Sequence, residues 1–197
     1  MSFPATFEIR PVQPADRHAV RRVDDTAFGG ERVPDLVDAL VAAGDVVASL
    51  VAEVAGEVVG HVQLSRCWVD ARERLVEVVS LSPLATEPAH QRLGIGSALV
   101  AAAVETAREL GEPAVFLEGD PAFYGSRGFL PAEPLGFGRP SQRIPEPAFQ
   151  VALLDEGLPR GRFVYCQTFW TQDCVGLRDP RLARVEEALA AVSSASG

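Results

Sequence analysis

The first part of the chain combines one β-type pattern of apolar residues with two helical patterns. Residues 7–12 have the composition of a short strand that ends at a proline. A polar helix is predicted over residues 16–28, with Asp16 as its N-cap. Apolar residues then recur at helical spacing between 36 and 41, before Gly44, which suits the C-terminal end of a helix. We therefore expect two helices before the main sheet.

β-Branched residues dominate the middle of the chain. Residues 46–55 and 57–68 are typical of two strands joined by a tight turn, which predicts a hairpin. A third apolar strand is expected over 75–84, followed by a glycine-containing loop, a helix over 97–110 and a strand over 114–118. This succession is a βαβ unit, whose two strands should lie parallel.

Prolines mark the start of the C-terminal part. Five of them fall within residues 131–147, which predicts a long loop of the kind that often carries function. Residues 149–154 and 162–169 are interpreted as two strands that pair as an antiparallel hairpin. A last helix should begin after the Asp179-Pro180 pair, and its apolar stripe could pack on its own sheet or form a homodimer. The stripe consists of Leu182, Val185, Leu189 and Val192.

Length and composition limit the architecture. The chain has 197 residues, of which 47% are hydrophobic. This is enough for one substantial core and short for two domains, so we interpret the protein as one mixed α/β domain with a small appendage. Cys67, Cys166 and Cys174 have spacings unlike those of a paired zinc motif, so we expect buried reduced thiols and no metal site.

Charge excludes several classes of function. The net charge is −9 and the 18 arginines are scattered along the chain, which disfavours a nucleic-acid partner. The sequence contains no lysine, which excludes a P-loop lysine and a lysine Schiff base. No apolar run approaches the roughly 20 residues that span a bilayer, and the start lacks a signal-peptide pattern. We expect a cytoplasmic protein without a membrane partner.

The most informative segment follows the third strand and opens the helix after it. It reads Gln91-Arg92-Leu93-Gly94-Ile95-Gly96. A helix start has backbone N–H groups without internal partners, and Gly94 and Gly96 lack the Cβ that would keep an anion away, which suits a phosphate or diphosphate. The glycines alone could also merely permit a strand-to-helix turn. A dinucleotide-binding fingerprint would need glycine or alanine at position 99, where Leu99 stands.

This segment resembles the Q/R-x-x-G-x-G/A acyl-CoA motif of GNAT acetyltransferases, with Leu84-Ala85-Thr86 in place of their usual Leu-Ala-Val. Residues 119–129, which read Gly-Asp-Pro-Ala-Phe-Tyr-Gly-Ser-Arg-Gly-Phe, resemble the second motif of the family. The Gly-Asp-Pro-x-x-Tyr form is similar to the YhbS-like branch, and the resemblance spans residues 7–169.

The resemblance implies a GNAT-type mixed α/β fold, in which helices flank a mostly antiparallel sheet with a central parallel βαβ unit. Residues 1–170 would form the acetyltransferase domain and residues 171–197 a C-terminal helical extension. The implied cofactor is acetyl-CoA, with its pantetheine arm beside Leu84 to Thr86 and its diphosphate on the following helix start. The predicted cofactor-binding residues are Leu84, Ala85, Thr86, Gln91, Arg92, Leu93, Gly94, Ile95, Gly96 and Ser97.

The resemblance also implies direct attack of a primary amine, from a small molecule or a peptide, on the acetyl thioester. Tyr124 occupies the family's general-acid position, with aromatic packing against Phe123 and Phe129 as its alternative role. The Leu84 amide would stabilise the negative charge that develops on the acetyl oxygen. The proline-rich loop at Arg139–Pro147 is expected to contribute to substrate access.

The general base is left open by the sequence. Ser80 falls where other members carry a catalytic glutamate. Glu77 lies nearby on the opposite strand parity, and His61 belongs to a residue type suited to proton transfer near neutrality, so either could act through water. A structural role is the alternative for His61. Alternative functions are an acyl-CoA-binding sensor without turnover, transfer of a longer acyl group, and acyl-CoA hydrolysis, for which no Gly-x-Ser-x-Gly motif is present.

Overall fold

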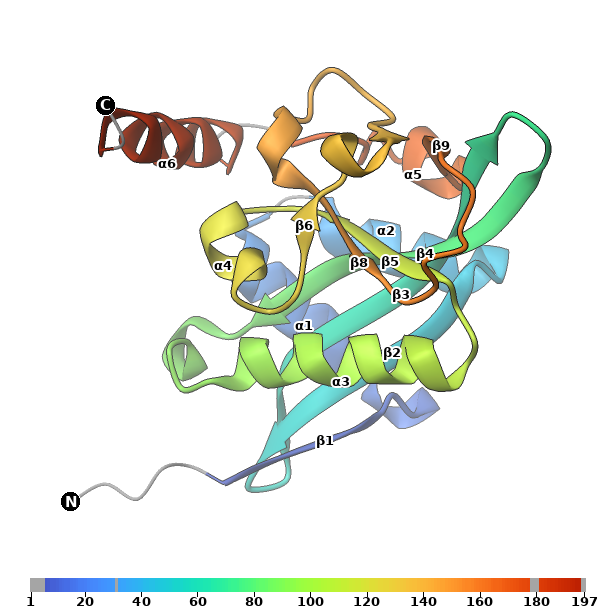
Figure 1. The fold of residues 1–197 in the computed structure, drawn as a ribbon. Helices are drawn as coiled ribbons and strands as arrows, with labels where there is room; N and C mark the ends of the chain where they lie inside the picture. The colour runs from blue at the N-terminus through green and yellow to red at the C-terminus, as the bar shows by residue number, and fades with distance from the viewer. Residues whose placement is uncertain (1–5, 31, 178–180, 196–197) are drawn as a thin grey trace.

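The computed structural model describes residues 6–30, 32–177 and 181–195, in which nine strands form one sheet (Figure 1). The strands are β1 (Phe7–Pro11), β2 (Val46–Val54), β3 (Glu57–Ala71), β4 (Leu75–Thr86), β5 (Ala114–Glu118), β6 (Leu130–Pro131), β7 (Phe137–Gly138), β8 (Phe149–Leu153) and β9 (Gly161–Tyr165). The α-helices are α1 (Arg17–Phe28), α2 (Val33–Ala43), α3 (Ile95–Glu109), α4 (Pro121–Gly125), α5 (Gln167–Thr171) and α6 (Arg181–Ala195). Short 3-10 turns lie at η1 (Pro14–Asp16), η2 (Pro88–His90), η3 (Glu133–Leu135) and η4 (Glu146–Ala148).

The sheet is mostly antiparallel. Its strands follow the order β1-β2-β3-β4-β5-β8-β6, and β9 pairs with both β3 and β7. The described pairs are antiparallel except β4–β5 and β7–β9. The predicted fold class, with helices around a mostly antiparallel sheet and a parallel β4-α3-β5 unit, is therefore confirmed.

The parallel pair β4–β5 is short, and its strands then part. Their described register ends where Ser80 lies opposite Phe116. Beyond that point β4 continues beside β3 as far as Thr86. Strand β5 instead ends at Glu118 and pairs with β8 along its other edge. The carboxyl ends of β4 and β5 therefore diverge, and this divergence positions the site described below.

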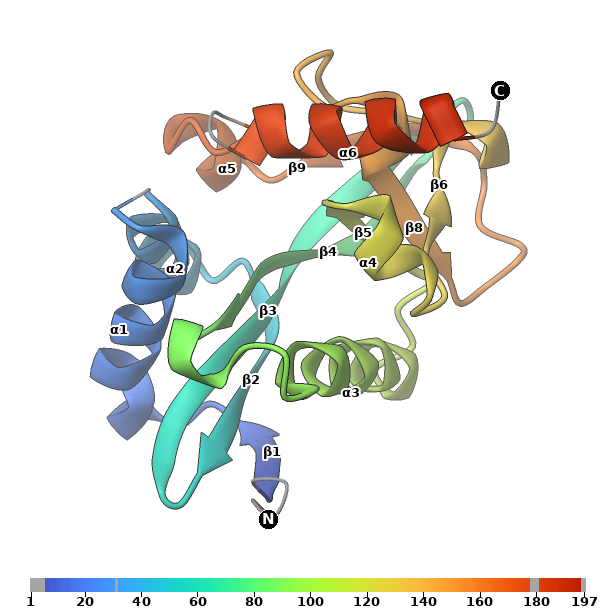
Figure 2. The same cartoon turned by 90° about the vertical axis from the view of Figure 1, so that its left-hand side faces the viewer.

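Helices cover both faces of the central strands (Figure 2). On one face, α3 buries an apolar stripe against β2, β3 and β4, because its small and branched residues recur every three or four positions. Gly60 of β3 permits this approach, since a Cβ there would lie 2.9 Å from Leu99 Cδ1 and 3.0 Å from Ile95 Cγ2. On the other face, α1 and α2 pack Val20, Val23 and other residues against the sheet.

A second apolar cluster surrounds Phe116 on the face opposite α3. Its phenylalanine rings come from β5, β7, β8 and β9 and make stacked, tilted and edge-on contacts. Val185 of α6 is buried in this cluster, and Leu182 and Leu189 pack beside it, so the last helix docks on its own chain. Its predicted N-cap pair Asp179-Pro180 and the Val192 side chain lie outside the described residues. No helix in the described ranges has the length and apolar character that crossing a membrane requires.

The predicted C-terminal hairpin is wrong. Strand β8 pairs with β5 and β6, whereas β9 pairs with β3 and β7, so the two strands are not neighbours. The edge of β5 that does not face β4 is completed by β8. Strand β3 extends beyond its pairing with β2, and residues 67–71 receive β9 instead. The predicted strand over 162–169 also ends early, at Tyr165, because α5 begins at Gln167.

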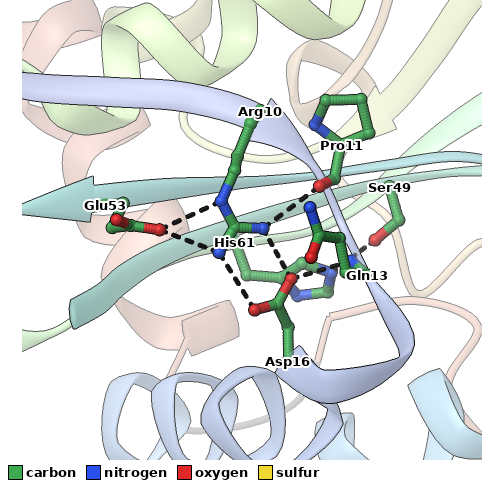
Figure 3. A network of polar contacts seen from close by, with 7 residues as sticks. All are labelled: Arg10, Pro11, Gln13, Asp16, Ser49, Glu53 and His61. Atoms are coloured by element: carbon green, nitrogen blue, oxygen red, sulfur yellow. Dashed lines mark hydrogen bonds and ion pairs between the residues drawn. The ribbon is translucent and has the colours of Figure 1, made fainter. Parts of the chain in front are cut away.

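Asp16 precedes α1, as predicted, but its side chain does not cap that helix. Its carboxylate accepts the Gln13 backbone N–H at 2.7 Å and hydrogen bonds from Arg10 at 2.6 and 3.0 Å (Figure 3). The Arg10 guanidinium also binds Glu53 at 2.8 Å. These hydrogen bonds from Arg10 hold the pKa of Asp16 below its usual value. The Asp16 side chain therefore connects η1 to Arg10 of β1 and, through Arg10, to Glu53 of β2.

Candidate active site

A cavity of about 520 Å³, which we call the loop cavity, lies where β4 leads into α3. It is lined by Leu84, Thr86, Gln91, Arg92, Gly94, Gly96, Ser97, Phe123 and Arg127. Seven of the ten predicted cofactor-binding residues thus line this cavity. Ala85 is buried in the apolar cluster that contains Val20 and Val23 of α1, and Leu93 and Ile95 lie in the same loop and first helical turn.

The glycines shape the start of α3. Gly94 has φ +88°, a left-handed conformation that disfavours other residues, and it serves as the N-cap. The Ala98 N–H bonds to the Gly94 carbonyl at 3.0 Å. The amides of Ile95, Gly96 and Ser97 precede that bond, so helix geometry leaves them unsatisfied within α3 and suited to an anion. A helix therefore begins directly after Gly94, as expected, and anion binding by its first amides stays a prediction.

A side-chain hydrogen bond and an unusual backbone conformation further define this loop. The Gln91 side-chain amide donates to the Thr86 carbonyl at 3.1 Å, which ties the loop to the end of β4. Arg92 has φ +61°, in a region that L-residues rarely adopt. A Cβ at Gly96 would lie 3.7 Å from Phe123 Cζ and 3.7 Å from Thr86 Oγ1, so Gly96 faces the space between α4 and β4.

A second cavity of about 380 Å³, the strand cavity, lies at the diverging ends of β4 and β5. It is lined by Phe28, Arg32, Val33, Leu36, Leu81, Ser82, Pro83, Leu84, Glu118, Tyr124, Tyr165, Phe169, Asp173, Cys174, Gly176 and Leu177. Leu84 lines both cavities, so the two adjoin there. Residues of α1, α2, α4 and α5 contribute to its lining; in Figure 2, α1 and α2 lie at the left, α5 lies above α2, and α4 lies to the right.

A β-bulge in β4 forms one wall of the strand cavity. Leu81 lies opposite Leu64 and Leu84 lies opposite Val62, so β4 has one more residue than β3 between these pairs. The extra residue falls at Ser82-Pro83, and both residues line the cavity. The bulge therefore displaces β4 from regular pairing at the point where the two cavities meet.

Tyr124 lies on a short helix that its neighbours fix firmly. Helix α4 begins after Asp120, whose carboxylate accepts the Ala122 N–H at 2.9 Å as an N-cap. The Tyr124 ring is edge-on to Phe123 and Phe129, at centroid distances of 4.8 and 5.8 Å. It also covers Gly119, where an added Cβ would overlap the ring. Tyr124 thus makes the aromatic packing contacts that the sequence offered as the alternative to a catalytic role. It also lines the strand cavity.

Glu118 is a functional candidate that the sequence analysis missed. Its Oε1 accepts the Tyr165 hydroxyl at 2.8 Å and the Gly176 backbone N–H at 3.3 Å. Burial and then the Glu118 charge raise the pKa of Tyr165 well above its usual value, so Tyr165 remains a donor. The available signal was a carboxylate that ends a buried strand directly before the Gly-Asp-Pro-x-x-Tyr motif.

The predicted base candidates lie away from both cavities. His61 is fully buried, with Nδ1 3.0 Å from the Asp24 carboxylate and Nε2 3.0 Å from Ser49 Oγ, whose side chain Figure 3 also shows. It therefore links β3 to α1 and β2. Glu77 is half exposed and pairs with Arg66 at 2.9 Å near the start of β4. Ser80 is buried and lines neither cavity.

The cysteines differ from one another in environment. Cys67 and Cys166 are buried, as predicted, whereas Cys174 is partly exposed and lines the strand cavity. Burial and then Asp45 raise the pKa of Cys166 to about 11, which keeps this thiol protonated near neutrality. Within the described residues, no three His, Cys, Asp or Glu side chains are placed to hold a metal ion.

Residues 139–147 line neither cavity, and their expected contribution to substrate access stays a prediction. They support a segment that lines the strand cavity. Arg143 donates to the Val175 carbonyl at 2.9 Å, next to Gly176 of the strand cavity. The Arg139 side chain binds Glu133 at 3.0 Å and the Ile144 carbonyl at 2.8 Å, which closes the loop on itself.

The comparison with protein families gives the same assignment as the geometry. A family model described as the acetyltransferase (GNAT) family matches residues 18–137, which include both motifs and most of the sheet. The chain belongs to the GNAT family of acetyltransferases. An individual GNAT relative, the uncharacterized N-acetyltransferase YjhQ of Escherichia coli (strain K12), is 32% identical over 128 residues, which cover 64% of this chain and 70% of YjhQ.

Two solved GNAT structures agree with the fold of this family member. YhbS of Escherichia coli, solved in complex with CoA, is 27% identical with a TM-score of 0.77 and covers 86% of this chain and 94% of its own. A GNAT acetyltransferase from Brucella melitensis, solved in complex with acetyl-CoA, is 28% identical with a TM-score of 0.70 and covers 84% and 99%. The similarity to YhbS agrees with the branch that the Gly-Asp-Pro-x-x-Tyr form indicated.

Proposed function

We propose that this GNAT protein transfers the acetyl group of acetyl-CoA to the primary amine of a small molecule by direct attack. The observation that carries the proposal is the junction of two different cavities at Leu84, with Tyr124 on the wall of the second. The loop cavity would bind the donor and the strand cavity the acceptor. Two similar structures were solved with CoA and acetyl-CoA, which supports this choice of donor.

The loop cavity fits the phosphate end of acetyl-CoA. It combines the α3 amides of Gly96 and Ser97 with the side chains of Arg92 and Arg127, and its lining contains no carboxylate. Acetyl-CoA supplies the activated acetyl thioester. The diverging end of β4, at Leu84 to Thr86, would hold the pantetheine arm, and the Leu84 amide would stabilise negative charge on the acetyl oxygen.

Tyr124 would protonate the departing thiolate. A tyrosine hydroxyl is a proton donor near neutral pH, and the packing of its ring limits the positions that the hydroxyl can reach. We assign the role of general base to Glu118, the last residue of β5, because it lines the strand cavity whereas Glu77 and His61 do not. Tyr165 and the Gly176 amide would orient the Glu118 carboxylate to accept the proton of the amine.

The dimensions of the strand cavity favour a small acceptor over a peptide. About 380 Å³ is near the lower end of typical small-molecule sites. Aromatic and aliphatic side chains form much of the wall, and Glu118 and Asp173 contribute negative charge. This combination suits the ammonium group of a compact amine whose remaining atoms are partly apolar.

The proposal is tested first by calorimetry with acetyl-CoA and then by turnover assays against a panel of small amines and amine-bearing peptides. Mass spectrometry of the products identifies N-acetylation. The Tyr124→Phe variant should bind acetyl-CoA with unchanged affinity and lower kcat about 10²-fold, the range for loss of a positioned acid. Its melting temperature controls for loss of packing.

Three outcomes would contradict the proposal, each in favour of a named alternative. Tight acetyl-CoA binding without product from any amine would indicate a sensor. Thiol release without an acceptor would indicate acyl-CoA hydrolysis. A higher kcat/KM with propionyl- or octanoyl-CoA than with acetyl-CoA would indicate transfer of a longer acyl group.

A further inference from the structure

Arg127, two residues after α4, connects the two halves of the site. Its Nε and Nη2 donate to Ser97 Oγ at 3.1 and 2.6 Å. Its Nη1 donates to the Phe123 carbonyl and, at 2.9 Å, to Ser126 Oγ. The guanidinium carbon also lies 3.6 Å from the centroid of the Phe123 ring. One planar group thus holds α4 against the first turn of α3.

The charge of Arg127 has no acidic counterpart in the part of the chain that the structure describes. Its hydrogen-bond acceptors there are two hydroxyls and one carbonyl, and no described ion pair includes it. This contrasts with the net charge of −9 and with Arg10, Arg21 and Arg66, which all bind carboxylates. A partly buried cation that lines the loop cavity is therefore left to interact with an anionic ligand.

The contacts of Arg127 lead from the loop cavity to the strand cavity in two steps. Ser97 belongs to the helix start that suits a diphosphate, and Arg127 binds its hydroxyl. Phe123 receives the guanidinium on its ring and carbonyl, and packs edge-on against Tyr124. A displacement of the guanidinium therefore moves Phe123, on which the orientation of Tyr124 depends.

We propose that Arg127 is a positioning residue that couples binding of the acetyl-CoA diphosphate to the placement of Tyr124. The proposal rests on the proposed function, since it assigns Tyr124 a proton to deliver. Arg127 would pair its charge with a phosphate of the bound donor while its guanidinium keeps its contacts with Ser97 and the Phe123 ring, and the position of Phe123 would in turn hold Tyr124. Lysine has the charge but not the planar fork, so it cannot bind Ser97 and cover Phe123 in the same way.

The variants Arg127→Lys and Arg127→Gln separate charge from geometry. Arg127→Lys should keep the acetyl-CoA Kd within about threefold, because it keeps the charge, and lower kcat about tenfold. Arg127→Gln should lower kcat to a similar extent and also raise Kd about tenfold, as expected for the loss of a charged contact. Ser97→Ala, which removes the acceptor and not the cation, should resemble Arg127→Lys. Calorimetry measures Kd without turnover, and melting temperatures show whether each variant is folded.

A double-mutant cycle with Tyr124→Phe decides whether Arg127 acts through Tyr124. If it does, Arg127→Lys should change kcat by less than about twofold in the Tyr124→Phe background. Equal effects of Arg127→Lys in both backgrounds would overturn the proposal, as would full activity of Arg127→Lys. A wild-type protein that binds acetyl-CoA but makes no acetylated product would overturn the proposed function and this proposal together. An active wild type with additive effects would overturn only this one.

Discussion

The two cavities that meet at Leu84 are built in different ways. The loop cavity comes mainly from one stretch of chain, residues 84–97, with Phe123 and Arg127 added from the α4 region. The strand cavity takes its wall from separate stretches, which include residues 28 and 32–36, 81–84 and 165–177. When one stretch of chain forms a site, the residue types and their spacing in the sequence indicate the chemistry of that site. A site assembled from many stretches depends on how the whole fold brings them together.

The cavities also differ in charge. Arg92 and Arg127 are the charged residues that line the loop cavity, which suits an anionic donor. Glu118 and Asp173 face the strand cavity, where Arg32 is the one cation among its described lining residues. Opposite charge in adjoining cavities favours a donor and an acceptor that approach Leu84 from different sides.

The largest effect is expected at Glu118 of the strand cavity. Glu118→Gln keeps an oxygen that can accept from Tyr165 and Gly176 but removes the basic carboxylate. We expect kcat to fall about 10³-fold, within the range for a positioned general base, while acetyl-CoA affinity stays unchanged. The measurement is kcat against pH, in which the limb that reports the base should disappear. Asp173→Asn is the matched control. An equal loss of kcat in that variant would contradict the assignment of Glu118 as the general base.

The next effect concerns the loop cavity alone. In Gly96→Val, the γ-methyl groups would occupy the space between Phe123 and Thr86 and displace a phosphate from the α3 amides. Loss of such charge-assisted hydrogen bonds should raise the acetyl-CoA Kd about 10²-fold. Gly96→Ala is the control, because its Cβ would make only ordinary contacts at 3.7 Å. Unchanged calorimetric affinity of a folded Gly96→Val protein would place the donor site elsewhere.

Gly119→Ala should test whether a change at Tyr124 in the strand cavity leaves the loop cavity unaffected. The added methyl group would overlap the Tyr124 ring and turn it, without reaching the loop cavity. A kcat loss of about tenfold with unchanged acetyl-CoA affinity is expected, since a small misplacement of a catalytic group is costly. The same substitution in the Tyr124→Phe background should then have little effect on kcat. An equal loss in both backgrounds would mean that the ring position does not matter for proton transfer.

The smallest effect is expected far from both cavities, at Arg10. Because Arg10 lowers the pKa of Asp16, it contributes stability above the usual value of 3.8 that is lost as the pH falls through the lowered value. Arg10→Gln should therefore lower the free energy of unfolding by about 1 kcal/mol at pH 7, typical of a single hydrogen-bonded pair. Urea unfolding at several pH values should show this difference vanish in acid. Constant kcat and Kd at pH 7 would confirm that neither cavity depends on the pair.

The sequence predicted those features of the fold that are determined locally. Gly44 ends α2 in a left-handed conformation and the hairpin turn follows Val54, because glycine positions and strand composition act over a few residues. The pairing of β8 and β9 was wrong because buried strands have similar composition whichever strand they join. Their partners are set by vacant edges on β5 and β3, which no local pattern records.

The same distinction applies to the site. The helix start at Gly94–Ser97 was predictable because its amides and glycines are contiguous. His61 seemed a candidate base because its residue type titrates near neutrality, but its strand face is covered by α1, where Asp24 binds it. Glu118 was missed because its partners Tyr165 and Gly176 lie far along the chain. Its environment exists only once β3, β5 and β9 lie in one sheet.

The separate construction of the strand cavity has a consequence for how such an enzyme can change over time. Residues 165–177 form one side of that cavity and contribute nothing to the lining of the loop cavity. Under the proposed function, substitutions in this segment would alter which amine fits while leaving donor recognition intact. A single scaffold of this kind can diversify into enzymes for different amines by gradual change in one short stretch. The same stretch is the natural target for a library that selects new acceptors in the laboratory.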